Sequence, residues 1–255
     1  MWTGSHFLLY IATFIIIAVV AFCVGKSFKD EEESIRMVPL KVVSVLLIVF
    51  EIFKQIISLI KGYNLFHFPL HYCSLFLYLL PLFCFYNGKY KKIVNALTIS
   101  TCMSLFLVML IFPTSIYGIN VIQGFFEDYF DFQSIMFHFW VCLFFFLMIS
   151  LRFIKFDFKE DIKWICIVIP VYLVIPAIAS NLLDTNYHGM LYMIVDSIDS
   201  VRLSLIASIG GLGQAIYCLM VIIVSTVFSL ISYVLFYKVY NVVGKRCKEW
   251  IRKIY

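Results

Sequence analysis

Seven long apolar stretches follow one another along the chain, separated by short polar segments. A helix needs ~20 mainly apolar residues to cross the hydrocarbon core of a bilayer, and each stretch is close to that length. Hydrophobic residues make up 63% of the chain and charged residues 14%, a balance that a water-facing surface does not accommodate. The sequence therefore predicts an all-α, polytopic bundle of seven transmembrane helices in a single domain. The expected spans are residues 7–25, 39–60, 70–86, 93–112, 134–151, 164–183 and 215–237.

Lysine and arginine predict how these spans are oriented. All but three of the 20 Lys and Arg residues lie in or beside the first, third and fifth connections or in the C-terminal tail. Cytoplasmic segments of membrane proteins carry an excess of these residues. The alternation therefore predicts an N-terminus outside the cell and a C-terminus in the cytoplasm. The three exceptions are Lys54, Lys61 and Arg202.

The connections also indicate partners and location. Basic cytoplasmic loops favour contact with anionic lipid headgroups, whereas no basic run interleaved with aromatic residues points to nucleic acid. No positive residue precedes the first span, so we expect a retained helix and not a cleaved signal. Eight cysteines without a C-x-x-C pair predict no disulfide framework. We expect a multi-pass protein of a bacterial plasma membrane, and the sequence leaves its oligomeric state open.

Four polar side chains interrupt the second apolar stretch. Glu51, Lys54, Gln55 and Ser58 follow i, i+3, i+4, i+7 spacing and therefore share one face of a helix. A charge at the centre of a bilayer costs ~3 kcal/mol even on lenient scales, so this face is expected to point into the bundle. It is either part of a functional site or a structural Glu51–Lys54 pair that locks helix packing.

The third stretch opens with the sequence Pro69-Leu70-His71-Tyr72-Cys73-Ser74. Proline suits the first turn of a helix, which predicts that Cys73 lies within about that turn. Free N–H groups and the helix dipole stabilise a thiolate at such a position, whereas apolar burial opposes ionisation. Cys73 is therefore either a reactive thiol or an inert buried one.

The fifth and sixth stretches add further polar groups. Ser134, His138 and Cys142 share one helical face, and a histidine inside an apolar helix needs a partner or a chemical task. Asn181 ends the sixth stretch, and Asn186-Tyr187-His188 follows it. The predicted topology places all five histidines on the outer side. We expect a polar cavity that opens outward, unless the outer loops have simply collected histidines.

Residues 188–206 follow these polar groups and are only moderately apolar. They are expected either to lie along the outer interface or to re-enter the bundle.

Three of these elements together resemble the YwaF-type integral membrane proteins of bacteria. They are Pro69 to Ser74, the histidine His138 early in the fifth span, and the segment from Asn181 to Tyr187. That family is distantly similar to eukaryotic transmembrane acyltransferases that act on ether phospholipids. The resemblance implies that Cys73 carries the acyl group and that His138 is its base. The chain departs from the family pattern at 209–214, before the last span, and at His188.

Two classes of function follow from these residues. The first is a lipid acyltransferase or acyl hydrolase that forms an acyl-cysteine and needs neither cofactor nor metal. His71 or Glu51 would orient the base, Asn181 or Asn186 would donate to the oxyanion, and membrane lipids would be the substrates. The second is a binding or transport protein in which the same cavity takes a metal ion or a small solute. The supporting polar residues expected in either case are His71, Glu51, Lys54, Asn181, Asn186, Tyr187, Ser74 and Ser134.

Overall fold

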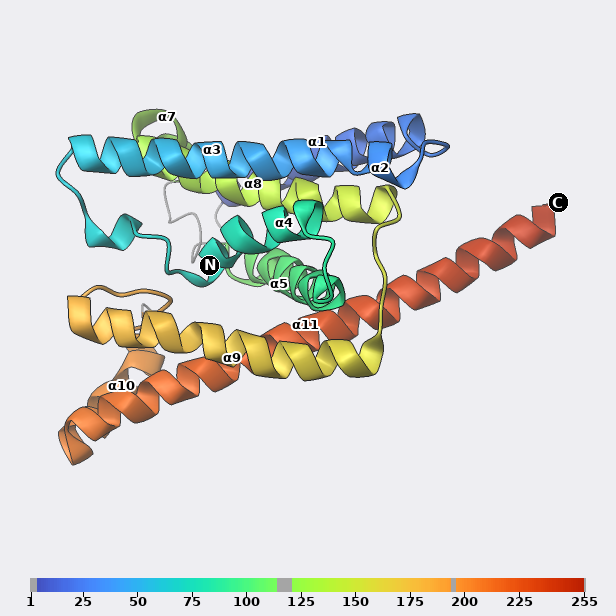
Figure 1. The fold of residues 1–255 in the computed structure, drawn as a ribbon. Coiled ribbons are helices and arrows are strands. Elements are labelled where there is room, and N and C mark those ends of the chain that lie inside the picture. Colours follow the sequence, from blue (N-terminus) through green and yellow to red (C-terminus); the bar gives the residue numbers. More distant parts are fainter. Residues whose placement is uncertain (1–3, 114–120, 194–195, 255) are drawn as a thin grey trace.

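The computed structural model describes residues 4–113, 121–193 and 196–254, and within these ranges every regular element is a helix (Figure 1). The all-α prediction is therefore confirmed for this part of the chain. Six helices are long: α1 (Gly4–Ser27), α3 (Val38–Ile60), α5 (Lys91–Ile111), α8 (Tyr129–Ser150), α9 (Phe158–Leu183) and α11 (Gly211–Ile254). The shorter helices are α2 (Glu33–Arg36), η1 (Leu65–His67), η2 (Tyr72–Leu75), α4 (Phe76–Phe85), α7 (Val121–Glu127) and α10 (Asp196–Ile209).

Each of the six long helices is long and apolar enough to cross a membrane, so the chain is a multi-pass membrane protein. The third predicted span, residues 70–86, differs from the rest. Its helical part, Tyr72–Phe85, is shorter than the others and rises only ~21 Å at 1.5 Å per residue, against a hydrocarbon core of ~30 Å. The crossing made by this segment, and with it the count of seven, stays a prediction.

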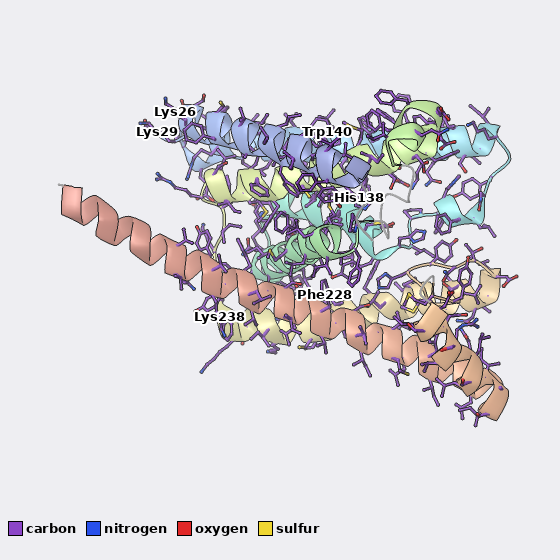
Figure 2. All side chains as sticks on the ribbon, turned by 180° about the vertical axis from the view of Figure 1, so that it is seen from behind. Lys26, Lys29, His138, Trp140, Phe228 and Lys238 are labelled. Carbon is purple, nitrogen blue, oxygen red and sulfur yellow. The ribbon has the colours of Figure 1, made fainter. Side chains whose placement is uncertain are left out.

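The connections that carry most of the positive charge gather at one end of the bundle. In Figure 1 the links from α1 to α3, from α4 to α5 and from α8 to α9 lie on the right, whereas η1, α7 and α10 lie on the left. Figure 2 shows Lys26, Lys29 and Lys238 at this basic end and His138 further along the bundle. The side on which this end lies in the cell stays a prediction.

Helices α5 and α8 form the centre of the bundle and are its most buried long helices. Small hydroxyl side chains on α5 allow other helices to come close, and their hydroxyls bond carbonyls one turn back or on another helix. Thr98 donates to Val94 O, and Ser100 donates to Ser229 O of α11 at 2.9 Å. The other long helices turn many Leu, Ile, Val and Phe side chains outward, as a lipid-facing surface requires.

Two polar contacts fix the basic end. Arg36 Nη1 donates to Leu151 O at the C-terminus of α8 over 3.0 Å, where the helix dipole favours a cation. The Tyr233 hydroxyl of α11 donates to the carboxylate of Asp161 in the first turn of α9. These contacts join α2, α8, α9 and α11 at the end opposite the polar residues singled out above.

Helix α10 and the start of α11 form a tight hairpin. Gly210 makes the turn with a φ of 59°, a backbone conformation that glycine adopts without strain. A Cβ added at Gly213 would lie 2.4 Å from the carbonyl carbon of Leu205, so the two helices approach closely. No residue of α10 is buried. Residues 196–206 thus lie against α11, and their position relative to a bilayer stays a prediction.

Candidate functional site

An ion pair marks the polar face of α3. Lys54 Nζ lies 2.7 Å from Glu51 Oε1, and both side chains are largely buried. The same carboxylate oxygen accepts a hydrogen bond from Gln55 Nε2 at 2.6 Å. The two charges therefore compensate each other.

The polar face of α3 also holds the segment that follows the helix. Gln55 Nε2 donates to His67 O at 2.8 Å, and Ser58 Oγ lies 2.8 Å from His67 Nδ1. The Tyr63 hydroxyl donates to Gln55 Oε1 at 2.8 Å. The His67 ring stacks on Phe130 of α8, with ring centres 4.0 Å apart. This network ties η1 to both α3 and α8.

His71 joins three separate segments. Its Nε2 lies 3.2 Å from Phe66 O, and because a carbonyl only accepts, Nε2 carries the proton. The Nδ1 atom then accepts from the backbone N–H of His188 at 3.5 Å. Its carbonyl accepts from the Tyr172 hydroxyl of α9 at 3.1 Å. Desolvation lowers the pKa of His71, which favours this neutral form.

Cys73 lies in the first turn of η2, directly before α4. The helix begins at Tyr72 with His71 as its N-cap, so Pro69 precedes the helix and does not lie in its first turn as the sequence suggested. The chain adopts an extended conformation at His71, with ψ at 159°, and this later start keeps Cys73 in the first turn. Its thiol is free and half-buried, and the neighbouring Ser74 is buried.

His138 is buried in α8, at 6% exposure. Its Nδ1 lies 2.6 Å from the backbone carbonyl of Ser134, one turn earlier. Since that carbonyl only accepts, Nδ1 carries the proton, and Nε2 of the neutral ring holds the lone pair. Ser134 therefore orients the ring through its backbone, whereas the sequence had singled it out for its side chain.

Helix α3, which carries Lys54, packs against α8, which carries His138, and against α4, which directly follows η2 and Cys73. A catalytic site formed by these three side chains stays a prediction.

The residues after α9 are engaged in holding their own loop. Asn186 Oδ1 accepts from the backbone N–H groups of Leu191 and Tyr192, at 3.0 and 3.3 Å. Asn181 Nδ2 donates to Ala177 O at 2.8 Å and lies 3.5 Å from Cys218 Sγ. These bonds engage both amides in local contacts, and their role as oxyanion donors stays a prediction.

Tyr187 is fully buried in the same loop. Its hydroxyl donates to Leu65 O in η1 at 2.6 Å, and its N–H donates to Ser180 Oγ at 3.0 Å. Tyr187 thus connects the loop after α9 with the loop after α3.

Comparison with known proteins places the chain in a family. A model of the TMEM164 family matches residues 1–240. The chain belongs to the TMEM164 family. No curated protein and no solved structure matches it. The resemblance to YwaF-type proteins and to ether-phospholipid acyltransferases stays a prediction.

Sequence reasoning missed several residues that complete the site of this TMEM164 family member. The Tyr72 hydroxyl lies 2.6 Å from Ser229 Oγ, and the Tyr72 ring stacks on His188 with ring centres 5.3 Å apart. His188 Nε2 lies 2.9 Å from Ser225 Oγ. Ser225 and Ser229 are spaced i, i+4 in the last apolar stretch, and this spacing was the available signal.

The metal alternative depends on donors that converge. Within residues 4–113, 121–193 and 196–254, no three His, Cys, Asp or Glu side chains come close enough together to hold an ion. His67 and His71 are engaged by Ser58 and by Phe66 O, as described above.

Proposed function

We propose that this protein is a membrane-embedded lipid acyltransferase or acyl hydrolase, with Cys73 as the nucleophile and His138 as its base. The observation that supports this proposal is the packing of α3 against both α8 and α4, because these helices carry or adjoin Lys54, His138 and Cys73. A thiolate needs a proton acceptor and a nearby positive charge. The three side chains supply both from three different helical elements.

The first half of the reaction forms a thioester. His138 Nε2 takes the proton of Cys73 Sγ, and the sulfur electron pair bonds to the ester carbonyl carbon of a lipid. The bond from that carbon to the glycerol oxygen breaks, and the imidazolium gives its proton to the leaving oxygen. The products are an acyl-cysteine and a lysolipid.

The second half releases the acyl chain. His138 takes a proton from the hydroxyl of a lysophospholipid or from water, and the oxygen attacks the thioester carbonyl. The carbon–sulfur bond breaks, and the sulfur recovers the proton from the imidazolium. Acyl transfer or hydrolysis results, depending on the acceptor. Every substrate except water stays in the bilayer, as a site within a membrane bundle requires.

Lys54 is the residue to which we assign charge stabilisation. An ammonium near the sulfur favours the thiolate and the oxyanion that develops on the ester carbonyl. Glu51 holds Lys54 in place at 2.7 Å and keeps the resting site close to neutral. Lys54 therefore takes the task for which the sequence had suggested Asn181 and Asn186.

The location of the site rests on the proposed topology. We propose seven crossings, with the shorter Tyr72–Phe85 helix as the third, an N-terminus outside and a cytoplasmic basic end. The site then faces the outer leaflet of the plasma membrane, and anionic headgroups contact the basic loops. Cys73 would meet lipid esters near the outer interface.

An acyl-transfer assay tests this function. The purified protein in nanodiscs is given a phospholipid with an isotope-labelled acyl chain and an unlabelled lysophospholipid, and labelled products are measured by mass spectrometry. In the wild type we expect the labelled chain to appear on the diacyl lipid made from the lysophospholipid, or as free fatty acid. Cys166→Ser is the control, because it removes an exposed thiol of α9, and it should give the same products. Cys73→Ser is expected to abolish both products, and His138→Gln is expected to slow their formation at least a hundredfold.

Turnover that persists unchanged in Cys73→Ser and His138→Gln would overturn the proposal. A wild type that turns over no lipid but carries a solute across the membrane would favour the transport alternative instead.

A further inference from the structure

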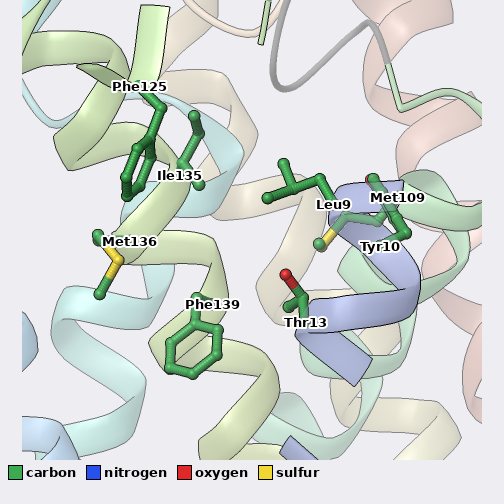
Figure 3. A pocket seen from close by; sticks show the side chains of 8 residues that line it. All are labelled: Leu9, Tyr10, Thr13, Met109, Phe125, Ile135, Met136 and Phe139. Atoms are coloured by element: carbon green, nitrogen blue, oxygen red, sulfur yellow. The ribbon is translucent and has the colours of Figure 1, made fainter. Parts of the chain in front are cut away.

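An apolar crevice opens between α1 and α8 on the side of the bundle that α7 caps (Figure 3). Leu9 and Thr13 of α1 lie across it from Ile135, Met136 and Phe139 of α8, and Met109 of α5 contributes to the wall. Its volume is about 130 Å³. Six of its eight lining side chains end in a hydrocarbon or thioether group, and Tyr10 and Thr13 carry the two hydroxyls.

A cavity of this kind takes hydrocarbon and not water. Each water needs two to four polar partners, and an engineered cavity of ~150 Å³ with an apolar lining stays dry and binds benzene. The crevice is of similar size and lining. It is too small for the side of a second helix, whose diameter with side chains is ~10 Å. A single lipid acyl chain, which is one methylene group wide, fits the crevice.

The crevice lies beside the proposed base. Ile135 and Phe139 flank His138 on α8, so all three belong to the same turns of one helix. Met109 lines the crevice, and its sulfur lies 3.6 Å from the thiol of Cys142, one turn after His138. The crevice and the imidazole are therefore at the same depth along α8.

The crevice also borders the lipid. Leu8, Ile11 and Ile15 of α1 are each more than two-fifths exposed, and they lie next to the lining residues of the same helix. A lipid chain thus reaches the crevice from the bilayer without crossing a polar surface.

We infer that this crevice holds the acyl chain whose ester or thioester is processed at Cys73, an inference that rests on the proposed function. The occupant is one hydrocarbon chain of a membrane lipid. This crevice, which we call the slot, would select the chain and orient its carbonyl end toward α8.

Photo-crosslinking tests the slot independently of the chemistry. Protein with Cys73→Ser, in nanodiscs of phosphatidylcholine, is exposed to a phosphatidylcholine with a diazirine in its acyl chain, and crosslinked peptides are mapped by mass spectrometry. We expect labels at residues 9–13 and 135–139 in excess over positions that are more exposed to lipid, such as Phe22 and Leu219. Leu9→Trp fills the slot and, by excluding about two methylenes, is expected to lower the α8 label about tenfold. Ile11→Trp, on the same helix but facing lipid, leaves the α8 label unchanged.

The outcomes separate the slot from the function. Labels spread evenly over the lipid-facing surface, or an α8 label that survives both Leu9→Trp and a second filling variant, Thr13→Phe, would overturn the slot. A selective α8 label in a protein that never forms acyl-Cys73 would keep the slot and overturn the proposed function. A cysteine that is acylated equally well in Leu9→Trp would overturn only the slot.

Discussion

Two histidines of the site owe their tautomer to a backbone carbonyl. His138 donates from Nδ1 to Ser134 O, and His71 donates from Nε2 to Phe66 O. Each carbonyl fixes which ring nitrogen carries the proton and leaves the other as an acceptor. In His138 this leaves the lone pair on Nε2, whereas the acceptor of His71 takes the N–H of His188. The two histidines thus hold opposite tautomers, which the sequence does not distinguish.

His138→Gln tests the task of the base. The amide keeps a polar group in α8 but accepts no proton near neutral pH. General base catalysis contributes ~10²–10⁴-fold to a rate, so acylation of Cys73 should slow at least a hundredfold. The measurement is the initial rate of adduct formation by mass spectrometry. An unchanged rate at unchanged melting temperature would show that His138 is not the base.

Lys54→Met is predicted to destabilise the protein more than the double variant Glu51→Gln/Lys54→Met. The single change leaves the Glu51 carboxylate buried without its cation, which costs ~3 kcal/mol, whereas the double change removes both charges. Reversible unfolding in mixed micelles measures the difference. Both variants should lose acyl transfer, because the charge near Cys73 is absent in each. Equal stability in the two variants would contradict the pairing.

At the scale of elements, the site is assembled by loops that hydrogen bonds tie to helices. The loop after α9 reaches η1 through Tyr187 and η2 through His188. The start of the η2–α4 helix follows from this arrangement, because His71 stays extended and acts as the N-cap. Helical periodicity predicted that Glu51 and Lys54 share a face. It could not predict these contacts, because they join residues more than 100 positions apart in the chain.

Low pH is predicted to destabilise the folded protein through His188, in the loop after α9. Desolvation and the charge of His71 lower the pKa of His188 to about 4 from its usual 6.5. The folded ring therefore binds fewer protons than the unfolded one, and stability is complete above pH 6.5 and falls as the pH drops from 6.5 toward 4. The melting temperature should decline over this window, and less so in His188→Asn. An identical decline in the two proteins would exclude His188 as the cause.

Two neighbouring glycines test the hairpin of α10 and α11. A Cβ at Gly213 would lie 2.4 Å from the Leu205 carbonyl carbon, whereas one at Gly211 meets nothing within 4 Å. Gly213→Ala should cost ~1–3 kcal/mol and lower the melting temperature by about 2–12 °C, and Gly211→Ala should leave it nearly unchanged. Equal melting temperatures would mean that the two helices do not approach as closely as described.

For the whole molecule, the distribution of apolar residues predicted most of the helices. Apolar length alone places helices close to the observed α1, α3, α5, α8 and α9, because a lipid solvent leaves few alternatives to a helix. Helix α11 runs on to Ile254, beyond the expected end at residue 237, because the basic tail continues the same helix. The third span was predicted slightly too long at 70–86, because Leu70 and His71 precede the Tyr72–Phe85 helix and the chain is extended at His71. The tasks of Asn181, Asn186 and Ser134 depend on local backbone contacts, which residue type does not reveal.

Topology is predicted to follow the basic residues. The test uses a cysteine-free variant into which single cysteines are introduced. Three positions lie in the basic connections: Asp30, Gly88 and Asp157. Two positions lie at the opposite end of the bundle: Gly62 and Asp128. An impermeant maleimide applied to intact cells should label only positions 62 and 128, and lysis should expose the others. The reverse pattern would invert the proposed orientation and place the site on the cytoplasmic side.

The account depends most on a covalent acyl group at Cys73, and intact-mass spectrometry of the protein in lipid nanodiscs measures it directly. Brief incubation with a phospholipid of defined acyl composition should add the mass of one acyl chain. The added mass should map to the peptide that contains Cys73, disappear with hydroxylamine, and be absent from Cys73→Ser. A protein that turns over lipid with no added mass, or with the acyl group on another residue, would contradict the account.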